Sequence, residues 1–132
     1  MLRTGRGQSL VEFALIAPIL LLLIMGTLDL GRVFYVKIAL QSAAREGAYF
    51  VSYNGECSDP LNACYLDTIK TVQLEANNMG VTVVPADINV DPEVSLRGSP
   101  VTVTVSQVVD LFIFNFITGP IQVESNARML VQ

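Results

Sequence analysis

Residues Phe13 to Leu28 read FALIAPILLLLIMGTL, and no charged side chain lies between Glu12 and Asp29. As an α-helix this run is about 24 Å long, and the preceding residues from Gln8 extend it to about 30 Å, the thickness of a bilayer's hydrocarbon core. The sequence therefore predicts one membrane-spanning helix, over about residues 10–28. The alternative is a buried helix in a soluble protein, but few residues would then remain to surround a helix that is apolar on all sides.

Basic residues suggest how the helix would lie in the membrane. Arg3 and Arg6 precede the apolar run, and basic residues favour the cytoplasmic side, so we expect a single-pass protein of the cytoplasmic membrane with its N-terminus inside. A secretory signal removed on the outer side would end in a small-x-small site, whereas Asp-Leu-Gly-Arg follows Leu28. The apolar run is therefore predicted to be a retained anchor.

The composition excludes several classes of function. The chain has 132 residues and no histidine, which removes Ser-His-Asp, Cys-His and His-zinc chemistry. Gly5-Arg-Gly7 follows no strand and is no nucleotide-binding fingerprint. Asp91 and Glu93 could be imagined as a catalytic acid and base, but they lie in a proline-flanked polar stretch where solvated surface is expected. From Phe50 onward there are three basic and nine acidic side chains, which argues against nucleic-acid binding. We expect no catalytic residues, metal, cofactor or small-molecule substrate, and a membrane-anchored enzyme has no candidate chemistry.

A helical pattern continues beyond the anchor to about Tyr53. We therefore predict one long helix over residues 8–53, with Pro18 kinking or loosening its first half. A break near Gly26 to Gly31, giving two helices, is the alternative. The apolar and small residues that recur at spacings of three and four in the second half are Leu30, Val33, Phe34, Ile38, Gln41, Ala44 and Ala48.

Residues 54–132 are predicted to form a small α+β domain outside the membrane. A turn-rich loop, Asn54 to Asn62, precedes a short amphipathic helix with Leu66, Ile69, Val72, Ala76 and Met79, and Gly80 is placed to end it. The period then changes to that of strands in an antiparallel sheet, expected at Val81–Val84, Val94–Leu96, Val101–Val105 and Ile121–Met129. The apolar stretch Leu111–Ile117 fits a strand, a short helix or a loop that docks on the long helix.

Cys57 and Cys64 are the only cysteines, and both fall in the predicted outer domain. An even count in an oxidising compartment indicates a structural disulfide, with two free thiols as the alternative. Zinc would need further ligands, and a redox pair normally has two residues between its cysteines.

The N-terminal stretch Arg6-Gly-Gln-Ser-Leu-Val-Glu-Phe-Ala-Leu-Ile-Ala-Pro-Ile-Leu-Leu-Leu-Leu23 resembles TadE-like proteins, the pilin-like components of the tight-adherence (Tad) pilus in the type IV pilin superfamily. The likeness consists of a basic leader ending in Gly7, Glu12 as the fifth residue after it, and an apolar helix directly behind. Gly31-Arg-Val-Phe34, Ala43–Ala48 and the closing strand Ile121–Met129 fit the family more loosely.

The resemblance implies that residues 1–7 are a leader, which a prepilin peptidase removes by cutting between Gly7 and Gln8 on the cytoplasmic face. It also implies that Glu12 pairs with the free N-terminal amine of a neighbouring subunit, which would compensate a buried charge. The alternative for Glu12 is an interfacial glutamate facing lipid headgroups.

The outer domain departs from the major pilins of the Tad system, which are much shorter and nearly all helix. This favours a minor pilin or pseudopilin, with the membrane, prepilin peptidase, other pilin-like subunits and the Tad assembly platform as partners, and with a surface pilus as a possible destination. The rival hypothesis is a signal-anchored extracytoplasmic binding domain that keeps its leader and has no pilus role.

Overall fold

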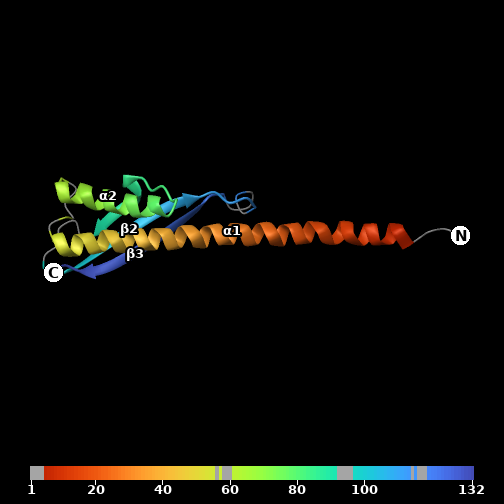
Figure 1. Ribbon diagram of the computed structural model, residues 1–132, viewed down its shortest axis with the longest axis horizontal. Coiled ribbons are helices and arrows are strands. Elements are labelled where there is room, and N and C mark those ends of the chain that lie inside the picture. The colour runs from red at the N-terminus through yellow and green to blue at the C-terminus, as the bar shows by residue number, and fades with distance from the viewer. Residues whose placement is uncertain (1–4, 56, 58–60, 92–96, 114, 116–118) are drawn as a thin grey trace.

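The computed structural model describes residues 5–55, 57, 61–91, 97–113, 115 and 119–132, and it confirms the α+β class (Figure 1). The predicted strand Val94–Leu96 lies outside the described residues. A long helix precedes a short helix and a three-stranded antiparallel sheet. The elements are α1 (Gly5–Asn54), α2 (Ala63–Asn78), the 3-10 turn η1 (Pro85–Asp87), β1 (Ile88–Asp91), β2 (Pro100–Val109) and β3 (Ile121–Leu130).

Helix α1 is one continuous helix of 50 residues, about 75 Å long. The alternative of two helices broken near Gly26 to Gly31 is therefore wrong. The helix begins at Gly5, three residues before the expected start, and it passes through Pro18 without interruption. The kink expected at Pro18 stays a prediction. Figure 1 shows the N-terminal half of α1 projecting alone and the C-terminal half lying along α2 and the sheet.

Small residues form the face of α1 that packs on the domain. Of the residues whose spacing predicted this half of the helix, Ala44 and Ala48 are buried, whereas Leu30, Phe34 and Ile38 are more than half exposed. Alanine carries little beyond its Cβ, so the helix axis comes closer to the sheet and α2 than larger side chains would allow. The residues of α1 in the buried core are Val36, Ala39, Leu40, Ala43, Ala44, Ala48 and Val51.

Gly47 lies where α1 crosses both α2 and β2. A Cβ atom built on it would lie 2.5 Å from Val72 Cγ2 and 3.3 Å from Val103 Cγ1. Both neighbours are buried and β-branched, and such side chains have few rotamers with which to move away. Glycine is therefore required here for close packing.

The sheet has the order β1-β2-β3, with β2 in the centre. The alternation predicted at Val101–Val105 is confirmed, because Val101, Val103 and Val105 are buried against the helices. Strand β3 pairs with β2 along its length, from Pro100 opposite Leu130 to Val109 opposite Ile121.

Helix α1 also reaches the free edge of β3. Lys37 Nζ donates a hydrogen bond to the backbone oxygen of Glu124, and Gln41 Nε2 donates to that of Asn126 at 2.9 Å. The backbone at a sheet edge is otherwise open to pairing with another strand. Side chains of the long helix therefore donate hydrogen bonds to part of the backbone at this edge.

The segment Val81–Val84 is extended but is not a strand, which corrects the prediction. Val81 and Val83 are buried in the expected alternation, yet none of the described strands pairs with them, and Gln73 Nε2 of α2 donates to the Val83 oxygen at 2.8 Å. The first described strand is Ile88–Asp91, which the sequence analysis missed although its four residues alternate between buried and exposed, because so short a segment gives only a weak periodic signal.

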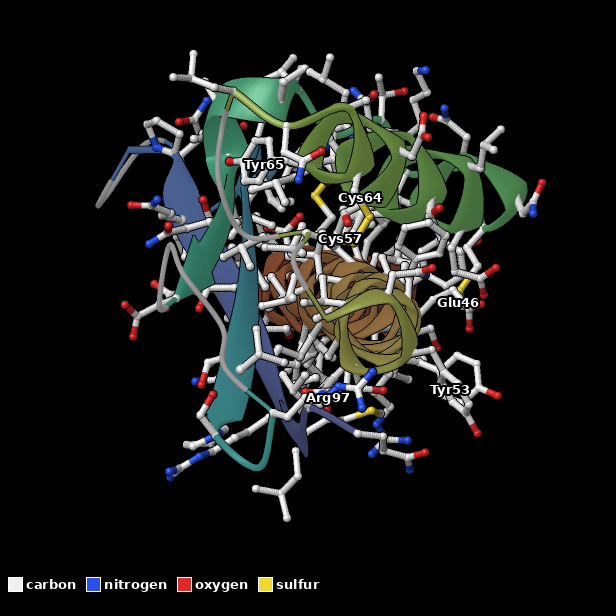
Figure 2. The ribbon with its side chains drawn as sticks, turned by 90° about the vertical axis from the view of Figure 1, so that its left-hand side faces the viewer. Glu46, Tyr53, Cys57, Cys64, Tyr65 and Arg97 are labelled. Carbon is white, nitrogen blue, oxygen red and sulfur yellow. A yellow bond between two sulfur atoms is a disulfide. The ribbon has the colours of Figure 1, made fainter. Side chains whose placement is uncertain are left out.

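Helix α2 ends as predicted at Gly80, which has a φ of +70°. The Gly80 N–H bonds to the Asn77 oxygen, and the Val81 N–H bonds to that of Ala76, which satisfies carbonyls at the helix end. At its other end, a disulfide joins Cys57 to Cys64, as predicted, and Figure 2 shows it between α1 and α2. Cys57 is fully buried, so the bond ties the connecting loop to the core.

We expect Gly47→Ala to destabilise the outer domain by about 1–3 kcal/mol, because a methyl group must be forced between two stiff valines. Guanidinium unfolding of the full chain in detergent micelles, followed by tyrosine near-ultraviolet circular dichroism, measures this. Gly31→Ala is the matched control, since no atom lies within 4 Å of a Cβ there. This control should be neutral or more stable by about 0.5–1 kcal/mol. Equal effects of the two changes would contradict the packing role of Gly47.

Candidate assembly site on the N-terminal helix

The N-terminal half of α1 exposes an unbroken apolar surface. Large apolar side chains from Leu10 to Leu28 are between 47% and 71% exposed, and nothing in the described chain covers them. The alternative of a helix buried within its own domain is therefore excluded for this chain. Helix α1 is long and apolar enough to cross a membrane. Exposed apolar surface of this size requires lipid or other protein around it.

The predicted site residues Gly7, Gln8 and Glu12 lie together on one side of this helix. Residues four apart are neighbours on a helix surface, and Gly7, Gln8, Val11, Glu12 and Leu15 line one shallow hollow. Glu12 is exposed and forms no ion pair with any side chain that the structure describes. The only carboxylate of the apolar surface is therefore next to the predicted cleavage junction and open to a partner.

Gly7 lies in the first turns of α1, and a Cβ there would meet nothing within 4 Å. A protease cleft usually binds its substrate as an extended strand, so cleavage at the predicted junction would require the helix to unwind locally. Glycine is a weak helix former, costing about 1 kcal/mol relative to alanine, which makes this unwinding easier.

Asp29 is a buried residue whose structural role the sequence analysis missed. Its side chain is only 1% exposed, although it directly follows the apolar run. Its two carboxylate oxygens accept hydrogen bonds from the backbone N–H groups of Phe112 and Ile113, both at 2.8 Å. Hydrogen bonds to an ionised acceptor are shorter and stronger than neutral ones. This pair of bonds, the Asp29 clasp, fixes the start of the segment Leu111–Ile117 to α1.

The start of Leu111–Ile117 is thus a loop that docks on α1, whereas Asn115 is helical, so of the three alternatives the described residues exclude a strand and show features of the other two. Leu111 is buried, Ile113 is half-buried and Phe112 is 68% exposed. Residues 114 and 116–118 lie outside the described part of the chain. Two features of the sequence pointed to these hydrogen bonds. One is the charged residue at the end of the apolar run, and the other is the second apolar stretch, whose position in the fold the sequence left open.

A second exposed face lies on the outer half of α1. Figure 2 shows Glu46 and Tyr53 on the side of α1 that neither α2 nor the sheet covers. The rings of Tyr49 and Tyr53 lie 4.8 Å apart. The neighbouring Tyr53 raises the pKa of Tyr49 above its ordinary value, with smaller contributions from desolvation and Glu46. Within the described ranges, no three His, Cys, Asp or Glu side chains are close enough together to hold a metal ion.

With this geometry established, the comparison with known families becomes informative. Residues 7–48 match the family model of TadE-like protein. Over these residues helix α1 is similar to TadE-like proteins. The match begins at Gly7, includes Glu12 and the whole apolar surface, and ends at Ala48, so the resemblance is confirmed for the helix and does not extend to the closing strand. No curated protein and no solved structure matches the chain.

We expect Asp29→Ala to release the docked segment from the TadE-like helix while the domain stays folded. Two backbone N–H groups then lose their ionised acceptor, which lowers the local free energy of opening by about 1–3 kcal/mol. The amides of Phe112 and Ile113 should therefore exchange roughly tenfold faster, or more, than in the unaltered protein. Hydrogen exchange followed by NMR measures this, with the Val103 amide in β2 as the internal control. Asp29→Asn keeps one acceptor oxygen and should give an intermediate rate, whereas unchanged exchange in Asp29→Ala would contradict the clasp.

Proposed function

We propose that the protein is a TadE-like minor pilin or pseudopilin that takes part in assembly of the Tad pilus. The observation that carries this proposal is the family match over residues 7–48, because it covers a helix whose N-terminal half is left exposed by the residues that the structure describes. A pilin-like subunit uses one such helix in two successive surroundings, first in the bilayer and then among the helices of its neighbours.

In this proposal α1 spans the cytoplasmic membrane once, over about residues 10–28, with its N-terminus inside. Residues 54–132 then lie outside, where the compartment is oxidising. The disulfide between Cys57 and Cys64 supports the placement of this domain outside the membrane, because such bonds persist in oxidising compartments. Arg3 and Arg6 favour the same orientation.

Processing creates the group that Glu12 needs. A prepilin peptidase cuts between Gly7 and Gln8 on the cytoplasmic face, removes residues 1–7 and leaves a free amine on Gln8. An unpaired carboxylate among apolar side chains is costly, so Glu12 gains when it meets the amine of a neighbouring subunit. Pairing between subunits would then favour one axial offset between adjacent helices.

The outer domain supports a minor rather than a bulk role. Helix α2 and the sheet both pack against the C-terminal half of α1, so each copy occupies more lateral space there than a bare helix would. We infer that the protein acts at limited copy number, as a priming or structural component beside other pilin-like subunits and the assembly platform.

The processing step predicts a native N-terminus at Gln8. Intact-mass measurement of the protein purified from cells with active peptidase should show loss of residues 1–7. Gly7→Leu should leave most of the chain uncleaved, because a side chain now stands at the cut bond. Gly26→Leu, also at a position with open space around it, is the control and should be processed normally. An N-terminus still at Met1 in the unaltered protein would favour a signal-anchored binding domain instead.

The pairing role predicts that Glu12→Gln is inserted and cleaved normally but enters pili poorly. Leaving one partner of a buried ion pair alone costs about 3–5 kcal/mol, so the amount in sheared pili should fall by about tenfold or more. Immunoblots of membrane and sheared-pilus fractions measure both steps. Glu46→Gln is the matched control, as Glu46 is exposed on the outer half of the same helix. Equal incorporation of Glu12→Gln and the unaltered protein would rule out the pairing.

A further inference from the structure

The Asp29 clasp places an apolar side chain of the outer domain at the level where the predicted membrane span ends. Leu28 is the last residue of the uncharged run, and Asp29 follows it directly. The backbone nitrogen of Phe112 lies 2.8 Å from the Asp29 carboxylate, so its depth along α1 is fixed to within a side-chain length. Phe112 is 68% exposed, although it belongs to one of the most apolar stretches of the domain.

The surroundings of Phe112 continue the apolar surface of the span. Leu28 and Leu30 flank Asp29 on α1 and are 62% and 55% exposed. Asp29 itself is only 1% exposed, so the one charge at this level is shielded by its hydrogen bonds to the docked segment. Among the described residues, the apolar surface of α1 thus ends at the level of Phe112, where the carboxylate of Asp29 is shielded from solvent.

Two exposed charges limit how deep this region could lie. Arg32 is one turn farther from the span than Asp29, about 4.5 Å along the axis, and Asp110 precedes the docked segment at the end of β2. A guanidinium at this height lies among headgroup phosphates, with which it forms favourable hydrogen bonds. Phe112 is thus placed at the boundary between headgroups and acyl chains, and no deeper.

We propose that Phe112 inserts into the outer interface of the bilayer, so that the outer domain rests on the lipid surface at the segment held by Asp29. This inference rests on the proposed membrane anchoring of α1. Interfacial segments use exposed aromatic and aliphatic side chains in this way, with charged groups kept in the headgroup layer. The bilayer then holds the protein at two places, the span and this segment, and the second contact limits rotation of the domain about α1.

The absence of tryptophan from the sequence makes the proposal directly measurable. Three single-tryptophan variants of the full chain are placed in phosphatidylcholine vesicles that carry a nitroxide either near the headgroup or near the acyl-chain end. Phe112→Trp tests the inference, Leu20→Trp reports on the span, and Tyr53→Trp reports on the far end of α1. All three positions carry exposed large side chains, so each tolerates the exchange.

We expect Leu20→Trp to be quenched most by the deep nitroxide, Phe112→Trp most by the nitroxide near the headgroup, and Tyr53→Trp by neither. Quenching of Leu20→Trp without quenching of Phe112→Trp would overturn the inference and leave the anchor intact. Failure to quench Leu20→Trp would overturn the anchoring itself. An unquenched Phe112→Trp whose emission moves to shorter wavelength as the protein-to-lipid ratio rises would show that another copy covers this surface, which also overturns the lipid contact.

Discussion

One uninterrupted helix lies in two different surroundings, exposed in its first half and packed in the domain in its second. The rest of the structure depends on how the side chains of this helix change between the two halves. Up to Leu28, α1 has large apolar side chains that the described part of the domain leaves exposed. From Val36 onward its inner face consists mainly of alanines and Gly47, packed on α2 and the sheet. Between the two, Asp29 is a buried carboxylate whose partners are backbone groups from the far end of the chain. The helix is therefore not an anchor with a domain attached, because the core of the domain includes the helix itself.

This arrangement explains which features the sequence predicted. A long uncharged run is a strong signal, because no other common element needs it, and the same holds for the strict alternation at Val101–Val105. The glycine after α2 and the pair Cys57 and Cys64 were also predicted correctly, since each is a local requirement of turn geometry or bonding. The cleavage junction and the role of Glu12 came from the family resemblance, and the match over residues 7–48 supports the family and leaves those roles to experiment.

What the sequence did not predict has a common physical origin in packing that periodicity does not record. Leu30, Phe34 and Ile38 have helical spacing and hydrophobic side chains, yet the domain packs on the alanine face instead, because small side chains permit a closer approach. Val81–Val84 has the correct alternation for a strand but meets α2 rather than another strand. Asp29 looks like the solvated end of an apolar run until its partners, more than eighty positions away in sequence, are known. Long-range contacts of this kind cannot be read from local pattern.

The hydrogen bonds from Lys37 and Gln41 to β3 have a consequence for how copies of the protein can meet. A free sheet edge is a template for strand addition, which joins molecules without regard to any helix and grows without limit. On β3, the carbonyls of Glu124 and Asn126 already have donors from α1. An incoming strand would have to displace side chains that the helix holds in place. In the proposed pilin role, copies held in a membrane at high local density would be protected from irreversible aggregation through this edge, and contact between their helices would be the easier way to associate.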